Sequence, residues 1–364
     1  MIRPYGLPIE RLNEGKPIIV PTDNWWEDGT TFNPAALYLE RSSFNDPIIK
    51  KLLPGRSLDE PKLRSGVVAV FYRAQPREDP GFPFPRSFMG LALFTPELEL
   101  LERYPEPVIK PEEPPGYDYV GVEDARITRI GETFYALYCG FDGKNMRICM
   151  ASSRNLLNWE KLGLAKGEIN LSDNKDAVLF PEKIEGHYFM LHRPMVGRLS
   201  DFSIHLAISD LPTGVWRDCG MVLHSFNNPV CNDSWVGAGP VPVSLGNKRF
   251  LVFYHTGNYL KPNNRREYDM NAAIFNFQNF SLDSPDAIVE SRIEPLMVPE
   301  TEYEKNDSVS LDIVFPEGCY EYRDEIYILY GAGDRFVSAA KVGKKILIEH
   351  LEKSDSSNPF LKGN

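Results

Sequence analysis

The feature that most constrains the fold is a unit of short β-type segments that recurs five times along the chain. Each unit opens with a segment bearing proline or an acidic residue and continues with a segment that alternates aromatic and aliphatic residues. The opening segments are residues 32–37, 122–127, 179–184, 239–243 and 315–320. Because four-stranded units repeated around an axis form a β-propeller, we predict an all-β, five-bladed β-propeller. A β-sandwich with chance similarity between segments is the alternative.

The repeat also bears on domain organisation. The spacing between units is roughly fifty to eighty residues, which is long for a propeller blade but compatible with long loops. No amphipathic helical pattern extends beyond a few turns. We therefore expect one propeller domain over residues 1–364, with short N- and C-terminal extensions.

Composition excludes several classes of partner. The formal net charge is −11, which argues against nucleic acid and against anionic membranes as partners. Residues 1–8 carry no apolar signal segment and no run approaches transmembrane length, so we expect a cytoplasmic protein unless a leader has been removed. The five cysteines are scattered without CxxC spacing, which fits reduced thiols and gives no metal signature.

The segment 119–127 combines two adjacent carboxylates with an arginine at the start of a β-branched strand. Burying Glu123 and Asp124 unpaired would cost several kcal/mol, so the pair either faces water or serves chemistry. Asp124 could simply pair with Arg126, since residues i and i+2 lie on one side of a strand. Glu123 then points to the other side as the more natural structural partner. We favour a catalytic role for Asp124.

Hairpin geometry predicts that polar residues from several units meet at one mouth of the channel. The start of a first strand and the end of a second strand lie at the same end of an antiparallel hairpin. The insertion at residues 43–65 joins a first strand to a second and is expected at the opposite end. The side chains expected at the mouth are Asn33, Asp124, Glu182, Glu317, Arg73, Arg193, His255 and Asp334.

Structural roles remain open for three of these residues. Arg193 could be braced by Glu182 on the preceding strand. A lone histidine such as His255 is commonly a satisfied core residue, and Asp334 could be a turn aspartate between Gly333 and Arg335.

Motifs in register along the chain resemble glycoside hydrolase family 130, the five-bladed mannoside phosphorylases and mannosidases. The segments that carry the resemblance are residues 121–126, 175–183, 191–194, 237–242, 253–255 and 330–334. The resemblance implies that Asp124 is the general acid, passing its proton through a hydroxyl of the mannosyl unit. It also implies that Asn33, Arg73 and Asp334 hold the sugar, while Lys175, Arg193 and His255 hold the attacking phosphate in the phosphorylases. Glu123 and Trp235 are further substrate-binding candidates.

Two departures from the family pattern affect the predicted reaction. Trp235 stands at a position where the phosphorylases of that family share a lysine. Pro34 stands at a position where some members have a serine. Losing a cation and a hydroxyl weakens an anion clamp. We therefore expect inverting cleavage of β-mannosidic bonds with hydrolysis favoured, as in β-1,2-mannosidases, and with Glu267 as the catalytic base. Glu267 could instead be a solvated loop residue neutralised by Arg265 or Arg266.

Two alternatives to hydrolysis stay open: a β-mannoside phosphorylase that releases mannose 1-phosphate, and a non-catalytic carbohydrate-binding propeller. No metal or organic cofactor is expected, and inorganic phosphate would be a co-substrate only for a phosphorylase. The expected partner is a manno-oligosaccharide, and the sequence leaves homo-oligomerisation open.

Overall fold

The computed structural model describes residues 6–82, 84–226 and 230–354, and strands make up most of this part of the chain. The two α-helices there are short: α1 (Asn45–Leu52) and α2 (Lys344–Ser354). Within these ranges, no helix has the length and apolar character needed to cross a membrane. The fold is therefore all-β, as the repeated segments predict.

Three sheets are built from consecutive strands. Strands that are neighbours in each of these sheets are antiparallel, apart from the short parallel pairing of β10 with β14. The first sheet contains β2 (Thr30–Leu39), β3 (Val67–Gln75), β4 (Phe88–Phe94) and β5 (Leu100–Arg103). The second contains β6 (Gly121–Ile130), β7 (Thr133–Phe141), β8 (Met146–Ser153) and β9 (Glu160–Leu164). The third contains β10 (Lys166–Gly167), β11 (Asn174–Leu179), β12 (Tyr188–Pro194), β13 (Ile204–Ser209) and β14 (Val215–Leu223).

The remaining strands form one ten-stranded sheet. Its members are β1 (Glu10–Arg11), β15 (Cys231–Ala238), β16 (Val243–Gly246), β17 (Arg249–Leu260), β18 (Arg265–Asn276), β19 (Val289–Met297), β20 (Lys305–Asn306), β21 (Leu311–Tyr322), β22 (Glu325–Ala332) and β23 (Phe336–Gly343). A short parallel pairing of residues 266–268 with 311–313 joins β18 to β21. Hydrogen bonds thus join the last two expected units into one sheet. The structure divides the described strands into four sheets, and not into the five separate sheets that were expected.

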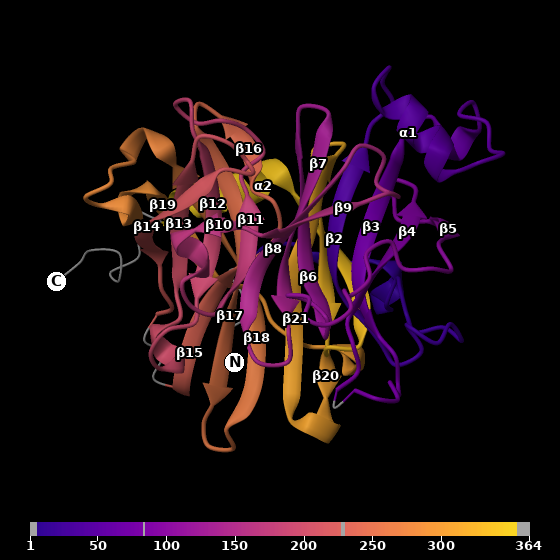
Figure 1. Cartoon of the computed structure of the whole chain (residues 1–364). Helices are drawn as coiled ribbons and strands as arrows, with labels where there is room; N and C mark the ends of the chain where they lie inside the picture. Colours follow the sequence, from indigo (N-terminus) through magenta and orange to yellow (C-terminus); the bar gives the residue numbers. More distant parts are fainter. Residues whose placement is uncertain (1–5, 83, 227–229, 355–364) are drawn as a thin grey trace.

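Apolar side chains fill the spaces between sheets. One buried cluster includes Val67, Phe71, Ile127 and Phe134, and so joins the first sheet to the second. Alternation along each strand sends these side chains inward. Helix α1, in the insertion between β2 and β3, buries Ile49 in the same cluster. In Figure 1, α1 lies at the opposite end of the strands from the turn between β17 and β18.

The strand boundaries of two units differ from those expected. The expected opening strands at residues 179–184 and 239–243 are wrong, because β11 and β15 end at Leu179 and Ala238. The prolines at 181, 240 and 242 follow the strands, as residues without a backbone N–H do. Glu182 is consequently exposed and accepts a hydrogen bond from Ser244 Oγ at 2.9 Å. It therefore neither joins Asp124 nor braces Arg193.

A β-bulge recurs in the first strands of several units. The register shifts after Phe32 in β2, Glu123 in β6, Lys175 in β11 and Pro316 in β21. At the first three shifts, Asn33, Asp124 and Asp176 have φ values of 48°, 53° and 57°. Asparagine and aspartate tolerate this left-handed region better than most residues. A bulge leaves a residue unpaired and re-aims its side chain, and these bulges bring polar groups into the centre of the fold.

Candidate active site

A small pocket of about 100 Å³ contains several of the predicted site residues. It lies where the bulged strands β2, β6 and β11 approach β18 and β21. The residues that line it are Phe32, Asn33, Arg73, Asp124, Lys175, Tyr268, Ile313, Phe315 and Asp334. The structure therefore brings together Asn33, Arg73, Asp124, Lys175 and Asp334, as the sequence predicts.

Asp124 is the most enclosed carboxyl that lines the pocket, with a residue exposure of 3%. Its Oδ1 accepts hydrogen bonds from Asn33 Nδ2 at 2.9 Å and Arg73 Nη1 at 3.1 Å. Its Oδ2 lies 3.6 Å from Lys175 Nζ. Burial alone would raise the pKa of Asp124, but Arg73, Lys175 and the Asn33 hydrogen bond outweigh burial and hold the pKa well below its usual range. The carboxyl is therefore ionised in the unliganded site.

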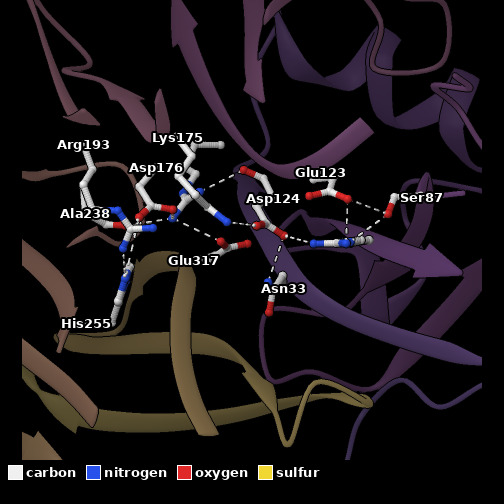
Figure 2. Close-up of polar contacts among 12 residues, drawn as sticks. Asn33, Ser87, Glu123, Asp124, Lys175, Asp176, Arg193, Ala238, His255 and Glu317 are labelled. Carbon is white, nitrogen blue, oxygen red and sulfur yellow. Dashed lines mark hydrogen bonds and ion pairs between the residues drawn. The ribbon is translucent and has the colours of Figure 1, made fainter. Parts of the chain in front are cut away.

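Glu123 and Ser87 hold Arg73 in place. Arg73 Nη2 donates to Glu123 Oε1 at 2.7 Å, and Arg73 Nε donates to Ser87 Oγ at 3.0 Å. Ser87 Oγ in turn donates to Glu123 Oε1 at 3.1 Å (Figure 2). Glu123 does not line the pocket, and its carboxylate instead binds the guanidinium of Arg73. An arginine fixed by two neighbours presents its remaining donors in a defined direction.

Asp334 is the second carboxyl that lines the pocket. Burial raises the pKa of Asp334 to about 6, with Arg73 opposing the rise and Asp124 adding to it. Its backbone also adopts the left-handed conformation, with φ of 53°. Two carboxyls at one pocket therefore differ in protonation near neutral pH, with Asp124 ionised and Asp334 titrating.

Asp176, Arg193, His255, Arg126 and Glu317 form a second polar cluster through ion-pair contacts. Figure 2 shows Asp176, Arg193 and His255 close together, on the side of Glu317 away from Asp124. Asp176 Oδ2 is 3.0 Å from Arg193 Nη1 and 3.6 Å from His255 Nε2. Although burial opposes ionisation, Arg193, His255 and Arg126 lower the pKa of Asp176. The sequence motif contains Asp176, but it was not singled out because its inward direction depends on the bulge.

Arg126 has a structural role different from the one considered from sequence. Its Nη1 donates to the backbone oxygen of Asp124 at 2.9 Å, not to the carboxylate. Nη2 donates to Ala238 O at 2.7 Å and lies 3.1 Å from Glu317 Oε1. The guanidinium therefore ties β6 to β15 and β21 at the centre of the fold.

Glu317 lies between Asp124 and Asp176 in Figure 2 and is fully buried. Burial raises the pKa of Glu317 well above its usual value. Arg126 opposes this rise, and the negative charges of Asp124 and Asp176 add to it. The pocket and the second cluster together contain four carboxyls, Asp124, Asp334, Asp176 and Glu317, and four cations, Arg73, Lys175, Arg126 and Arg193. Holding a proton on Glu317, and one on Asp334 at low pH, makes the site less negative and so more favourable for an anion.

Arg193 and His255 do not line the pocket. Arg193 Nη1 donates to His255 Nε2 at 3.2 Å, and burial lowers the pKa of His255 well below its ordinary value, with Asp176 offsetting this in part. The histidine ring packs on Phe315 with centroids 4.1 Å apart. Among the residues that the structure describes, Arg193 Nε is buried without a hydrogen-bond partner. This nitrogen is therefore a donor that a bound ligand could use.

Glycine at position 237 lets β15 approach this cluster. A Cβ atom there would lie 2.2 Å from Asp176 Oδ2 and 2.4 Å from His255 Cε1. Both distances are shorter than any tolerated contact, so any side chain at 237 would displace the Asp176–His255 pair.

Glu267 and Trp235 are not brought to the pocket. Tyr268 lines the pocket from β18, and neighbouring residues of a strand point to opposite faces, so Glu267 points away with Asp269. Trp235 is buried behind Tyr268, with ring centroids 5.5 Å apart. The structure thus gives neither a base role to Glu267 nor a direct sugar contact to Trp235. Phe32, Tyr268 and Phe315 are the lining aromatics that the sequence did not indicate.

Comparisons with known proteins point to one enzyme family. The family profile described as beta-1,4-mannooligosaccharide phosphorylase matches residues 88–353. The chain is 30% identical over 341 residues to a 1,2-beta-oligomannan phosphorylase of Thermoanaerobacter sp. (strain X514), covering 92% of this chain and 97% of that protein. It is 29% identical over 239 residues to a beta-1,2-mannobiose phosphorylase of Listeria innocua, covering 65% of this chain and 61% of that protein.

The solved structure of a beta-1,2-mannobiose phosphorylase from Listeria innocua, in complex with beta-1,2-mannobiose, superposes with a TM-score of 0.72 at 22% identity. The superposition covers 95% of this chain and 100% of the Listeria chain. At 22% identity, the similarity is evidence for the fold alone. These relationships define the protein as an enzyme that acts on β-mannosides, as a glycoside hydrolase or a glycoside phosphorylase. The chain belongs to glycoside hydrolase family 130.

Proposed function

We propose that the protein is an inverting β-mannoside phosphorylase that uses inorganic phosphate to release mannose 1-phosphate from a manno-oligosaccharide. The observation that carries this proposal is the convergence of Arg73 and Lys175 on Asp124 in one pocket. A general acid beside fixed cations suits an anionic nucleophile, because phosphate attacks without a protein base. The similarity to relatives named as phosphorylases supports the same reaction.

In this mechanism Asp124 protonates the leaving oxygen, through a hydroxyl of the mannosyl unit as the family resemblance implies. Asn33, Arg73 and Asp334 contact the sugar from the other lining positions. Phosphate oxygen attacks the anomeric carbon from the face opposite the leaving group, so the bond to the aglycone breaks as the bond to phosphate forms. Lys175, whose Nζ lies 3.6 Å from Asp124 Oδ2, is the lining cation that would hold phosphate, and Arg193 offers its free Nε.

The low pKa of Asp124 gives phosphate a second task. An acid must carry a proton, and Asp124 is ionised in the unliganded site because Arg73 and Lys175 outweigh burial. A phosphate dianion bound to Lys175 would offset part of that positive field and raise the pKa of Asp124. Phosphate would therefore both attack the sugar and favour protonation of the acid.

The preference for hydrolysis derived from the sequence has little support. It needed a base at Glu267, which does not line the pocket. It also took Trp235 as the replacement of a phosphate-binding cation, but the indole is buried behind Tyr268 and leaves the lining cations unobstructed. Phosphorolysis accordingly fits the pocket better.

We also propose that the sheets form the five blades of a single propeller domain, with the ten-stranded sheet counting as two blades. The pairing of β18 with β21 is parallel and only a few residues long, whereas the strands on either side of it pair in antiparallel order. An experimental structure with sheets around one channel would support this arrangement, and a closed sandwich would contradict it.

The reaction is tested by incubating the enzyme with β-1,2- and β-1,4-mannobiose, with and without phosphate. We expect sugar release only with phosphate, and mannose 1-phosphate as a product. Release of free mannose alone at an equal rate without phosphate would contradict the proposal. It would turn attention to Asp334, which shares the pocket with Asp124.

A further inference from the structure

A cluster outside the pocket contains His192 of β12, His205 of β13 and Asp218 of β14. His192 and His205 are direct partners across the sheet, with ring centroids 5.7 Å apart. Asp218 Oδ2 is 3.1 Å from His205 Nδ1, and Asp218 Oδ1 is 3.5 Å from His192 Nε2. Two imidazoles and a carboxylate at these separations could hold a metal ion or form a chain of hydrogen bonds.

The hydrogen-bond partner of His192 Nδ1 decides between metal binding and a chain of hydrogen bonds. Asn174 Nδ2 lies 2.8 Å from His192 Nδ1 and donates to Ile169 O at 2.6 Å. Asn174 Oδ1 accepts from the backbone N–H of Arg193 at 3.1 Å. The amide is therefore oriented with its NH₂ toward His192, so Nδ1 must be the acceptor nitrogen and Nε2 must carry the proton.

This tautomer disfavours a metal ion. A ligand nitrogen presents its lone pair to the metal, whereas in this tautomer the lone pair is on Nδ1 and the hydrogen is on Nε2, 3.5 Å from Asp218 Oδ1. Turning the amide over to allow the other tautomer would place its NH₂ against the Arg193 N–H. Burial lowers the pKa of His192, with Asp218 opposing, which is consistent with a neutral ring.

The chain of contacts leads to the pocket. Asn174 immediately precedes Lys175, and Lys175 and Arg193 are register partners at the mouth end of β11 and β12, just before the bulge at Asp176. The Asn174 amide bridges these two strands by accepting from the Arg193 backbone. Its orientation therefore affects both the lining cation Lys175 and the buried donor of Arg193.

We propose that His192 and Asn174 are positioning residues for the phosphate site: Asp218 orients His192, His192 fixes the Asn174 amide, and Asn174 holds the strand ends that carry Lys175 and Arg193. This inference rests on the proposed phosphorolysis. It assigns His192 to the orientation of the phosphate-binding side of the site and gives it no contact with substrate.

Two replacements of His192 separate positioning from packing. Asn places its oxygen where Nδ1 stands and keeps the acceptor, whereas Gln places its polar atoms nearer to Nε2 and loses that acceptor. Loss of one hydrogen bond corresponds to ~1 kcal/mol, so we expect His192→Gln to raise the KM for phosphate roughly fivefold to tenfold. The KM for mannoside should stay near the wild-type value, and His192→Asn should restore most of the phosphate affinity.

The matched control is His187→Gln, which replaces an exposed histidine immediately before β12 and should leave both KM values unchanged. If His192→Gln does not fold, Asp218→Asn, at a partly exposed site, should raise the phosphate KM severalfold. An equal rise in both KM values, or a His192→Asn enzyme worse than His192→Gln, would overturn the proposal. So would Zn²⁺ stabilising the wild type but not His192→Gln against thermal unfolding, because Nε2 would then be a ligand.

A measurement independent of phosphate tests the hydrogen-bond chain itself. ¹⁵N NMR of the labelled imidazoles, of which the chain has only six, should show His192 neutral with its proton on Nε2. A proton on Nδ1 would overturn the chain. A wild type that needs no phosphate would contradict the proposed function instead, and the tautomer would still decide whether His192 orients Asn174.

Discussion

Lys175 Nζ lies 3.6 Å from Asp124 Oδ2, so a cation from β11 and a carboxylate from β6 meet across two sheets. Both strands carry a bulge at this point, and Asp124 and Asp176 adopt the left-handed conformation there. Asp124 and Asp176 raise the pKa of Lys175 despite its burial, and Lys175 helps to lower that of Asp124. The pair couples the proposed acid to the proposed phosphate site, and the first two predictions depend on it.

Replacement of Asp124 by Asn should abolish turnover while the fold is retained. Asn keeps the size of the side chain but has no catalytic proton to donate, and general acid catalysis contributes ~10²–10⁴-fold. Initial rates of mannose 1-phosphate formation measure the effect, and circular dichroism checks the fold. A loss smaller than about tenfold on that scale would remove Asp124 from the acid role.

Replacement of Lys175 by Met should raise the KM for phosphate by about tenfold or more, because a hydrogen bond to a charged group contributes ~1.5–3 kcal/mol. It should also raise the pKa of Asp124, since Lys175 is one of the charges that lower it. The control is Lys183→Met, an exposed lysine beyond the end of β11. Equal effects of the two substitutions on phosphate would show that Lys175 does not bind it.

Asp334 should make the stability of the protein depend on pH. Its folded-state pKa is about 6, above the ordinary aspartate value of about 3.9. The stabilising contribution is fully present below the ordinary value and is lost as pH rises through about 6, because ionisation then favours the unfolded chain. Urea unfolding at about pH 4 and pH 8 should therefore show a larger fall for the wild type than for Asp334→Asn. Parallel pH dependence of the two proteins would contradict the raised pKa.

Glu267→Gln should retain most of the phosphorolytic activity, because Glu267 does not line the pocket. Burial raises the pKa of Glu267, and Asp312 adds to this rise. The comparison is with Asp334→Asn, which removes a lining carboxylate and should lower kcat/KM by a larger factor. An inactive Glu267→Gln enzyme with an intact fold would restore the base hypothesis.

Much of the site follows from sequence because hairpin geometry is simple. Asn33 and Asp124 lie near the start of first strands, and Arg73 lies near the end of a second strand, so their convergence could be predicted from strand pairing alone. The family motifs then added Lys175, which strand pairing did not indicate.

The parts that sequence did not predict depend on shifts of one or a few residues. Asp176, and not Glu182, enters the centre, because β11 ends before Pro181 and its bulge precedes Ala177. Tyr268, and not Glu267, faces the pocket, because a shift by one residue exchanges the two faces of a strand. Neither shift is encoded in the alternation of apolar residues.

The measurement that tests the central claim most directly is ³¹P NMR of the enzyme with a β-mannobiose and one equivalent of inorganic phosphate. We expect the phosphate signal to decline as α-mannose 1-phosphate appears, with one phosphate consumed for each bond cleaved. An unchanged phosphate signal while free mannose accumulates would contradict phosphorolysis, and formation of the β anomer would contradict inversion.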